Sequence, residues 1–148
     1  MRVAYCLSGL VGGLSGKNSE KNYGAEEVLN LCSDSIFKNT DIELDFFIHS
    51  WNTEFESLFN TIFKPKKMVL EPQIKFSIPY HLENTERIQN HYSRWYSNYI
   101  VNYIKSEYEF EHDFKYDLVL TTRFDIKWLK SIDFLSLDPS NVYIGKTY

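Results

Sequence analysis

The stretch Tyr116-Asp117-Leu118-Val119-Leu120-Thr121-Thr122-Arg123-Phe124-Asp125 gives the strongest indication of the fold. An apolar run typical of a buried strand ends abruptly in an arginine and a carboxylate two residues apart. Because side chains alternate along a strand, Arg123 and Asp125 are predicted to point to one face and Phe124 to the other. Open α/β sheets usually bind ligands at the carboxyl ends of their strands. The stretch therefore predicts either a ligand site or an ion pair that faces solvent.

Outward from this stretch, apolar runs alternate with helical patterns along the whole chain. Strands are expected at about 2–8, 44–49, 67–71, 117–122 and 142–145. Helices are expected at about 25–37, 52–63 and 84–109, and the broad aromatic stripe of the last one indicates that two of its sides are covered. Strands that alternate with helices favour βαβ units. The sequence thus predicts an α/β fold with a mainly parallel central sheet flanked by helices, in a single domain over 1–148.

Composition and charge exclude several classes of protein. The 148 residues are 43% hydrophobic, and a chain of this length can bury about two-thirds of its unfolded surface. A net charge of −4 argues against a nucleic-acid partner, which normally requires a basic stripe. No apolar run approaches the roughly 20 residues that span a bilayer, so no membrane span is expected. Two cysteines without a spacing framework, Cys6 and Cys32, are expected to be buried thiols in a reducing, cytoplasmic compartment.

Two further strand ends add candidate residues to the same predicted sheet edge. The first strand ends at Ser8-Gly9, before a glycine-rich loop whose backbone N–H groups could approach a diphosphate. The second strand ends at His49-Ser50-Trp51, where the imidazole could bind phosphate or metal, or be a hydrogen-bonded structural group. The indole could stack on a base or a sugar, or belong to the core. Because the carboxyl ends of parallel strands share one edge, we expect one common cleft there. Its predicted lining is Ser8, Gly9, His49, Trp51, Arg123 and Asp125.

The glycine-rich loop matches neither of two familiar phosphate-binding motifs. A phosphate loop needs a glycine five positions before Gly16-Lys17 and a hydroxyl residue after it, whereas this chain has Val11 and Asn18. The dinucleotide pattern Gly-x-Gly-x-x-Gly is also absent. A P-loop-type kinase or NTPase is therefore a minor alternative. No nucleophile elbow and no Cys–His signature is present, so the sequence does not support covalent catalysis.

Taken in order along the chain, three motifs resemble a group of bacterial and viral glycosyltransferases. The motifs are Leu7-Ser8-Gly9, Phe47-Ile48-His49-Ser50-Trp51, and Tyr116 through Asp125. The resemblance implies a GT-A-like, Rossmann-like nucleotide-binding domain with an Asp-x-Asp motif after a central strand. Arg123-Phe124-Asp125 stands at that place, with an arginine instead of the first carboxylate. Because the chain stops just after its last expected strand, a truncated or minimal version of the fold is expected.

The resemblance also implies an activity, which is transfer of a sugar from a nucleotide-diphosphate donor to a glycan or small-molecule acceptor. In that comparison Asp125 would ligate Mn²⁺ or Mg²⁺, and Arg123 would contact the diphosphate and supply part of the metal's charge. These two are the implied catalytic residues, and Arg123 also belongs to the donor-binding set with Ser8, Gly9, His49 and Trp51. The main alternative is a module that binds a nucleotide or a sugar without turnover.

Overall fold

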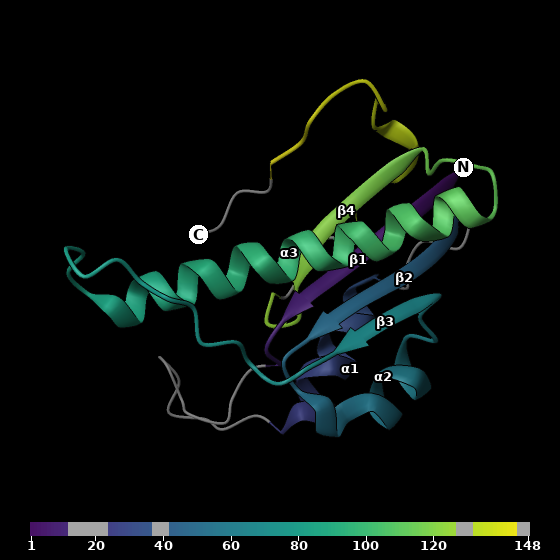
Figure 1. Cartoon of the computed structure of the whole chain (residues 1–148). Helices are drawn as coiled ribbons and strands as arrows, with labels where there is room; N and C mark the ends of the chain where they lie inside the picture. The colour runs from purple at the N-terminus through teal and green to yellow at the C-terminus, as the bar shows by residue number, and fades with distance from the viewer. Residues whose placement is uncertain (12–23, 37–41, 127–131, 145–148) are drawn as a thin grey trace.

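The computed structural model describes residues 1–11, 24–36, 42–126 and 132–144. Four strands form one parallel sheet in the order β3-β2-β1-β4 (Figure 1). The strands are β1 (Arg2–Gly9), β2 (Glu43–Ser50), β3 (Lys67–Leu70) and β4 (Leu118–Arg123). The α-helices are α1 (Ala25–Ile36), α2 (Glu56–Ile62) and α3 (Thr85–Glu111), and the short 3-10 helices are η1 (Thr53–Phe55) and η2 (Phe134–Ser136). The predicted α/β class and parallel sheet are confirmed.

Helices cover both faces of the sheet, with α3 on one face and α1 and α2 on the other (Figure 1). Since side chains alternate along each strand, each face has its own apolar cluster. The cluster on the α1 and α2 side includes Tyr5, Leu7, Leu29, Phe46, Ile48, Phe59 and Phe124. The cluster on the α3 side includes Ala4, Cys6, Phe47, Val101, Ile104 and Tyr116. Strand β1 contributes to both and is buried from Val3 to Ser8, which explains its nearly continuous apolar sequence.

The order of the strands defines a switch point in the sheet. The chain runs from β1 to β2 and β3 on one side, and α3 then carries it back to β4 on the other side of β1. The direction of winding therefore reverses between β1 and β4. In open α/β sheets, ligands bind outside the carboxyl ends of the two strands that flank such a point. The topology alone thus identifies the ends of β1 and β4 as the favoured place for a ligand.

One predicted strand is not formed. In the described part of 142–145, residues 142–144 pair with no strand, and Val142 and Ile144 are 91% and 90% exposed. Residue 145 lies outside the described residues. The segment follows a turn in which the Asn141 N–H donates to the Asp138 carbonyl oxygen, and it then runs away from β4 (Figure 1). The prediction was wrong because a high strand propensity forms a strand only where a neighbouring strand supplies hydrogen bonds.

The other boundaries agree with the sequence to within a few residues. The helices expected at 25–37 and 84–109 correspond to α1 and α3, and the one expected at 52–63 is split into η1 and α2; residue 37 lies outside the described residues. Cys6 and Cys32 are buried thiols, as predicted. Among the described residues, no helix is both long enough and apolar enough to cross a membrane.

Candidate functional site

The strand register brings three of the predicted site residues side by side at the carboxyl edge of the sheet. Ser8 of β1 lies directly between His49 of β2 and Arg123 of β4. Residues paired in this way send their side chains to the same face, which here is the face covered by α3. Beyond Ser8, the chain leaves β1 at Gly9, whose φ of 107° lies in the region that favours glycine. The shared edge inferred from the sequence is therefore present.

Arg123 and Asp125 form an ion pair at the end of β4, in which Nη2 of the arginine donates to Oδ2 of the carboxylate. Their side chains are 50% and 36% exposed, so the pair is open to solvent and to a ligand. Between them, Phe124 is buried on the opposite face, with its ring 5.2 Å from that of Phe59. Arg123 and Asp125 are thus brought together as predicted, with Phe124 buried on the opposite face, although β4 itself ends at Arg123 and the next two residues lie in a turn. The geometry itself is compatible with both predicted alternatives, a ligand site and a solvent-facing ion pair.

His49 is enclosed within the protein. Its Nε2 is 3.0 Å from Oε1 of Glu71, and its Nδ1 bonds to Oγ of Ser97 in α3. Because an ionised carboxylate only accepts hydrogen bonds, Nε2 carries the proton and the Ser97 hydroxyl donates to Nδ1. Burial lowers the pKa of His49, and the hydrogen bond and charge of Glu71 offset part of this effect. Both ring nitrogens are therefore used to join the ends of β2 and β3 to α3.

Trp51 is also enclosed, beside His49. The two rings meet edge to face at 4.7 Å, and the indole stacks on Tyr96 of α3 at 5.5 Å. Only 7% of Trp51 is exposed. For each of these two residues the sequence left a ligand-binding role and a structural role open. The structure places both His49 and Trp51 in positions typical of structural residues. The open part of the predicted site is reduced to the ends of β1 and β4.

Asn52 is a site-forming residue that the sequence did not indicate. Its Oδ1 accepts a hydrogen bond of 3.0 Å from the Val11 N–H, and its own N–H is 3.2 Å from Oγ of Ser50. That hydroxyl in turn donates to the Gly9 carbonyl oxygen at 2.9 Å. These contacts fix the first residues after β1 against the end of β2. An amide directly after a strand end was the only signal in the sequence.

Two arginines on α3 are further candidates that the sequence pattern did not single out. Helix α3 extends beyond the carboxyl ends of the strands (Figure 1), and the contact between Ser97 and His49 marks the level at which β2 ends. Arg94, one turn before Ser97, is therefore past this edge, and Arg87 follows two turns further on the same face. Both residues are exposed.

The direction of these arginines follows from Lys105, which lies eleven positions, or three turns, after Arg94 on the same helix face. Lys105 is buried next to Ile104, which packs against the sheet, so Lys105 is on the side of α3 that faces the sheet. Arg94 and Arg87 continue that face beyond the end of β1. A spacing of seven between arginines on the sheet-facing side of a helix is the signal that could have found them.

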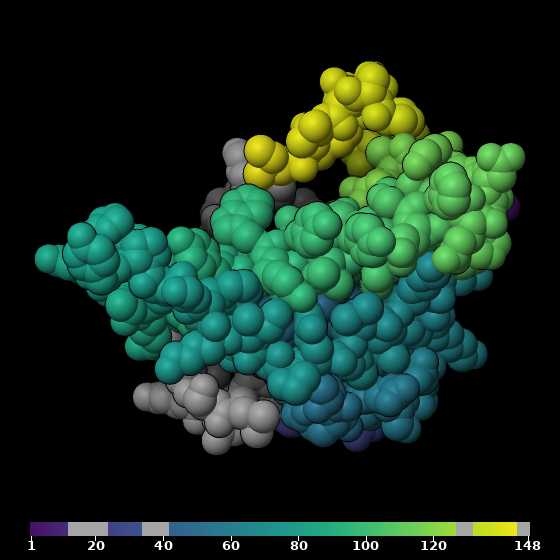
Figure 2. Space-filling model, in the orientation of Figure 1, coloured from purple at the N-terminus to yellow at the C-terminus, as the bar shows by residue number. Residues whose placement is uncertain are grey.

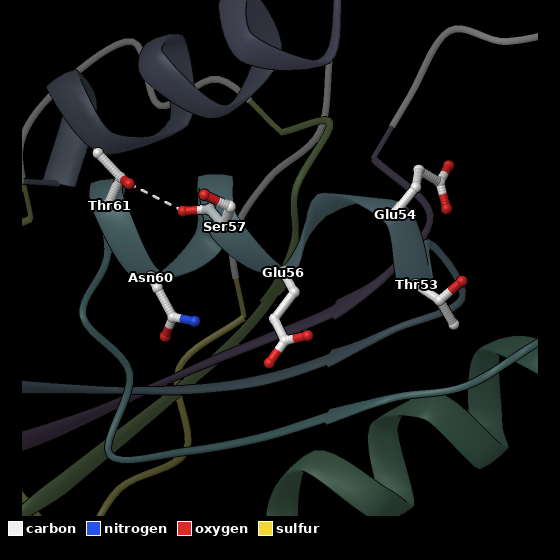
Figure 3. A pocket seen from close by; sticks show the side chains of 6 residues that line it. All are labelled: Thr53, Glu54, Glu56, Ser57, Asn60 and Thr61. Atoms are coloured by element: carbon white, nitrogen blue, oxygen red, sulfur yellow. Dashed lines mark hydrogen bonds between the residues drawn. The ribbon is translucent and has the colours of Figure 1, made fainter.

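One open hollow on the described surface lies elsewhere. It is an open depression on the outer side of η1 and α2 (Figure 3). Its lining is Thr53, Glu54, Glu56, Ser57, Asn60 and Thr61. It contains none of the six predicted site residues, and its two carboxylates would repel a diphosphate. The common cleft at the carboxyl edge stays a prediction.

The residues present do not by themselves make a metal site. Within the described ranges, no three His, Cys, Asp or Glu side chains are grouped so that they could hold a metal ion. Asp125, the metal ligand that the resemblance implies, already accepts from Arg123 through Oδ2.

Three comparisons with known proteins add nothing to this geometry: no family model, no curated protein and no solved structure matches the chain.

Proposed function

We propose that this domain binds a nucleotide-diphosphate sugar at the carboxyl ends of β1 and β4 and transfers the sugar to an acceptor. The observation that carries the proposal is the pairing of Ser8 with Arg123 across the switch point of the sheet. It puts a strand-to-loop turn, with its backbone N–H groups, beside a half-exposed guanidinium. Backbone N–H groups and a planar arginine fork are two groups that proteins commonly use to bind diphosphates.

The charge around this edge supports the proposal. The whole chain has a net charge of −4, yet three of its four arginines, Arg87, Arg94 and Arg123, belong to the overhang of α3 or to the end of β4. Their guanidinium groups would attract an anionic ligand to that place, against the charges of Glu71, Glu86 and Asp125 on the same or adjoining elements. The ion pair with Asp125 would keep Arg123 oriented while the site is empty.

In the proposed reaction, an acceptor hydroxyl oxygen bonds to the anomeric carbon and loses its proton to solvent, while the bond between the anomeric carbon and the diphosphate oxygen breaks and negative charge develops on the leaving diphosphate. Arg123 would stabilise that charge through two parallel hydrogen bonds, and Arg94 would approach from the other side. Such stabilisation accelerates transfer only if it is stronger in the transition state than in the bound donor. No step in this scheme depends on a metal ion.

A second function uses the same residues without turnover. Asp125 is the only carboxylate among the predicted site residues, one of its oxygens bonds to Arg123, and the sequence names no general base. This observation favours a module that binds a nucleotide or a sugar. Transfer and binding are separated by incubating the protein with a donor and measuring release of the nucleoside diphosphate.

The binding step is tested by calorimetry with uridine and guanosine diphosphates and their sugars. A bound nucleotide should stabilise the fold by about 2.7 kcal/mol at a hundredfold excess over its dissociation constant. Arg123→Ala should remove most of this stabilisation, and Arg94→Ala should reduce it. Arg2→Ala is the matched control, because Arg2 pairs with Glu43 at the opposite end of the strands. The proposal would be contradicted if none of these nucleotides and nucleotide sugars bound to the protein.

The role of Asp125 is tested by Asp125→Asn, measured with and without Mn²⁺ or Mg²⁺. A loss of nucleotide binding only in the presence of metal would assign the carboxylate to metal ligation. An equal loss in both conditions would show that Asp125 contacts the ligand or holds Arg123 in place.

A further inference from the structure

The outward face of α3 carries a row of exposed aromatic side chains. Counted along the helix, they occur at spacings of three, four or seven residues, so they form one stripe. Their exposed fractions range from 38% to 87%. The members of this aromatic stripe are Tyr92, Trp95, Tyr99, Tyr103 and Phe110. Figure 2 shows α3 crossing the front of the molecule, with its outward surface open along most of its length.

This stripe is not part of the core of the domain. The buried residues of α3 lie on the opposite side of the helix, where Val101 and Ile104 meet the sheet and Ser97 meets His49. A surface helix usually carries polar and charged residues on the side away from the core. Here the segment Trp95–Ile104 has no charged residue at all. A lack of charge combined with exposed tyrosine and tryptophan is typical of the centre of a protein–protein interface.

The area of the stripe is large enough for a stable contact between two copies. With about 200 Å² for a fully exposed aromatic side chain, the five rings expose on the order of 600 Å². This exposed area is at the upper end of the range for the largest apolar surface patch of a typical monomeric protein. Two such stripes facing each other would bury about 1,200 Å² in aromatic side chains alone, which is where specific interfaces begin.

The stripe is complementary to itself when two helices run antiparallel with Tyr99 at the centre. Tyr99 then faces its own copy, and Trp95 faces Tyr103 of the second copy. One turn further out, the large Tyr92 faces the small, exposed Ser106, and Ile88 faces Phe110 at the end. Large side chains therefore meet small ones or other rings, as packing of neighbouring helices requires. The uncharged centre brings no like charges together.

We propose that two copies of this chain associate through the outward faces of their α3 helices, antiparallel and with a two-fold axis at Tyr99. The inference does not depend on the proposed sugar transfer. It buries the aromatic stripe of each copy against that of the other and leaves the carboxyl ends of β1 and β4 outside the contact. A symmetric dimer in which one patch meets itself is the commonest form of oligomer.

A disulfide at the predicted axis tests the arrangement. Tyr99→Cys should give a covalent dimer under mild oxidation, because the two substituted positions meet at the axis. Phe110→Cys is the matched control, since α3 rises about 1.5 Å per residue and the two copies of this position would be about 33 Å apart. The native thiols of Cys6 and Cys32 are buried and should not react. Equal cross-linking of both variants would overturn the antiparallel arrangement.

Sedimentation equilibrium of the unmodified protein tests the association itself. We expect a dimer, and we expect Tyr99→Arg to be monomeric because two guanidinium groups would meet at the axis. Tyr99 is 64% exposed, so the variant should keep its helical circular dichroism. Tyr143→Arg, at an exposed position outside α3, should remain dimeric. A monomeric unmodified protein, including one that binds a glycan or another protein with the stripe, would overturn the proposal.

Discussion

His49 shows how a single polar residue can organise the edge of a parallel sheet. A buried imidazole is tolerated only when both nitrogens are hydrogen-bonded, and here the partners come from two different elements. Glu71, directly after β3, accepts from Nε2, and Ser97 of α3 donates to Nδ1. The Glu71 N–H also bonds to the Ser50 carbonyl oxygen, which extends the pairing of β2 with β3 by one residue. Burial disfavours the charged imidazolium, so the neutral form of His49 is the one favoured in this position.

The stability of the protein should therefore fall on mild acidification. Burial lowers the pKa of His49 below its ordinary value of about 6.5. The unfolded state then binds more protons below about pH 6.5, so stability is fully present above this value and is lost as the pH falls through it. We expect the melting temperature to decrease between about pH 7.5 and pH 5.5, a window set by that ordinary pKa.

The control for this effect is a comparison of two histidine variants. His49→Gln should have a lower melting temperature at neutral pH and a flatter dependence on pH in this window. His91→Gln, at an exposed position of α3, should keep the dependence of the unmodified protein. An unchanged slope in His49→Gln would show that another group causes the loss.

At the scale of residues, the sequence predicted where a side chain lies along its strand better than whether that side chain is buried or exposed. The opposite directions of the Arg123 and Phe124 side chains follow from the alternation at a strand end, so they could be predicted from neighbouring residues. The burial of His49 and Trp51 depends on Tyr96 and Ser97, more than forty positions later in the chain. No local pattern contains that information. The same reason explains why Asn52, which accepts from the remote Val11 N–H, was not predicted.

At the scale of elements, α3 is held at its end by one buried carboxylate. Glu109 accepts hydrogen bonds from the ammonium groups of Lys105 and Lys115, at 2.9 and 3.0 Å, and from the Tyr116 N–H at 3.0 Å. Burial alone would raise the pKa of Glu109, but these three hydrogen bonds outweigh it and hold the pKa below its usual range. The charged carboxylate thus ties the last turns of α3 to the start of β4.

We expect Glu109→Gln to lower the free energy of unfolding by about 3 kcal/mol, because removing one partner leaves the poorly exposed ammonium of Lys105 without its counter-charge. Denaturant titration at neutral pH measures this loss. Glu111→Gln is the control: Glu111 pairs with Lys67 at the exposed surface, where ion pairs contribute little. A loss for Glu109→Gln no larger than that for Glu111→Gln would contradict the assigned role.

The elements themselves were predictable where local signals and tertiary contacts agree. Asn84, an amide that accepts from the Arg87 N–H, begins α3 where the sequence pattern begins it. The stretch Val142-Tyr143-Ile144 has the residue types of a strand but no strand beside it, so propensity alone gave the wrong result. The aromatic stripe of α3 led to the prediction that two sides of this helix are covered. One side packs on the sheet, and another is covered by Phe76, whose ring lies 5.8 Å from that of Tyr96. The outward side is exposed, and periodicity cannot distinguish a covered face from an interface that awaits a second copy.

At the scale of the whole molecule, the strands of the sheet differ in how well they are covered. Strand β1 pairs with β2 and β4, and helices cover both of its faces. Helix α3 packs on β1, β2 and β3, whereas on β4 the residues that point toward the α3 side, Val119 and Thr121, are exposed. A parallel strand is usually buried on both faces. β4, which contributes Arg123 to the candidate site, is therefore less enclosed than its neighbour β1.

This inequality predicts an order of opening within the domain. Local opening needs less free energy where fewer apolar contacts and fewer protected hydrogen bonds must be lost. Native-state hydrogen exchange should therefore be slowest for the amides of β1, which lie between two paired strands, and measurably faster for those of β4.

The α3 pairing proposed above leaves this order unchanged, because its contact surface is on the far side of the helix from the sheet. A nucleotide bound between Ser8 and Arg123 should instead slow exchange at the end of β4 more than at its start, since only the end would contact the ligand. Protection of β4 equal to that of β1 in the free protein would show that another part of the chain, or a partner, covers the strand. In that case the exposed Arg123 described here would not be available to a ligand.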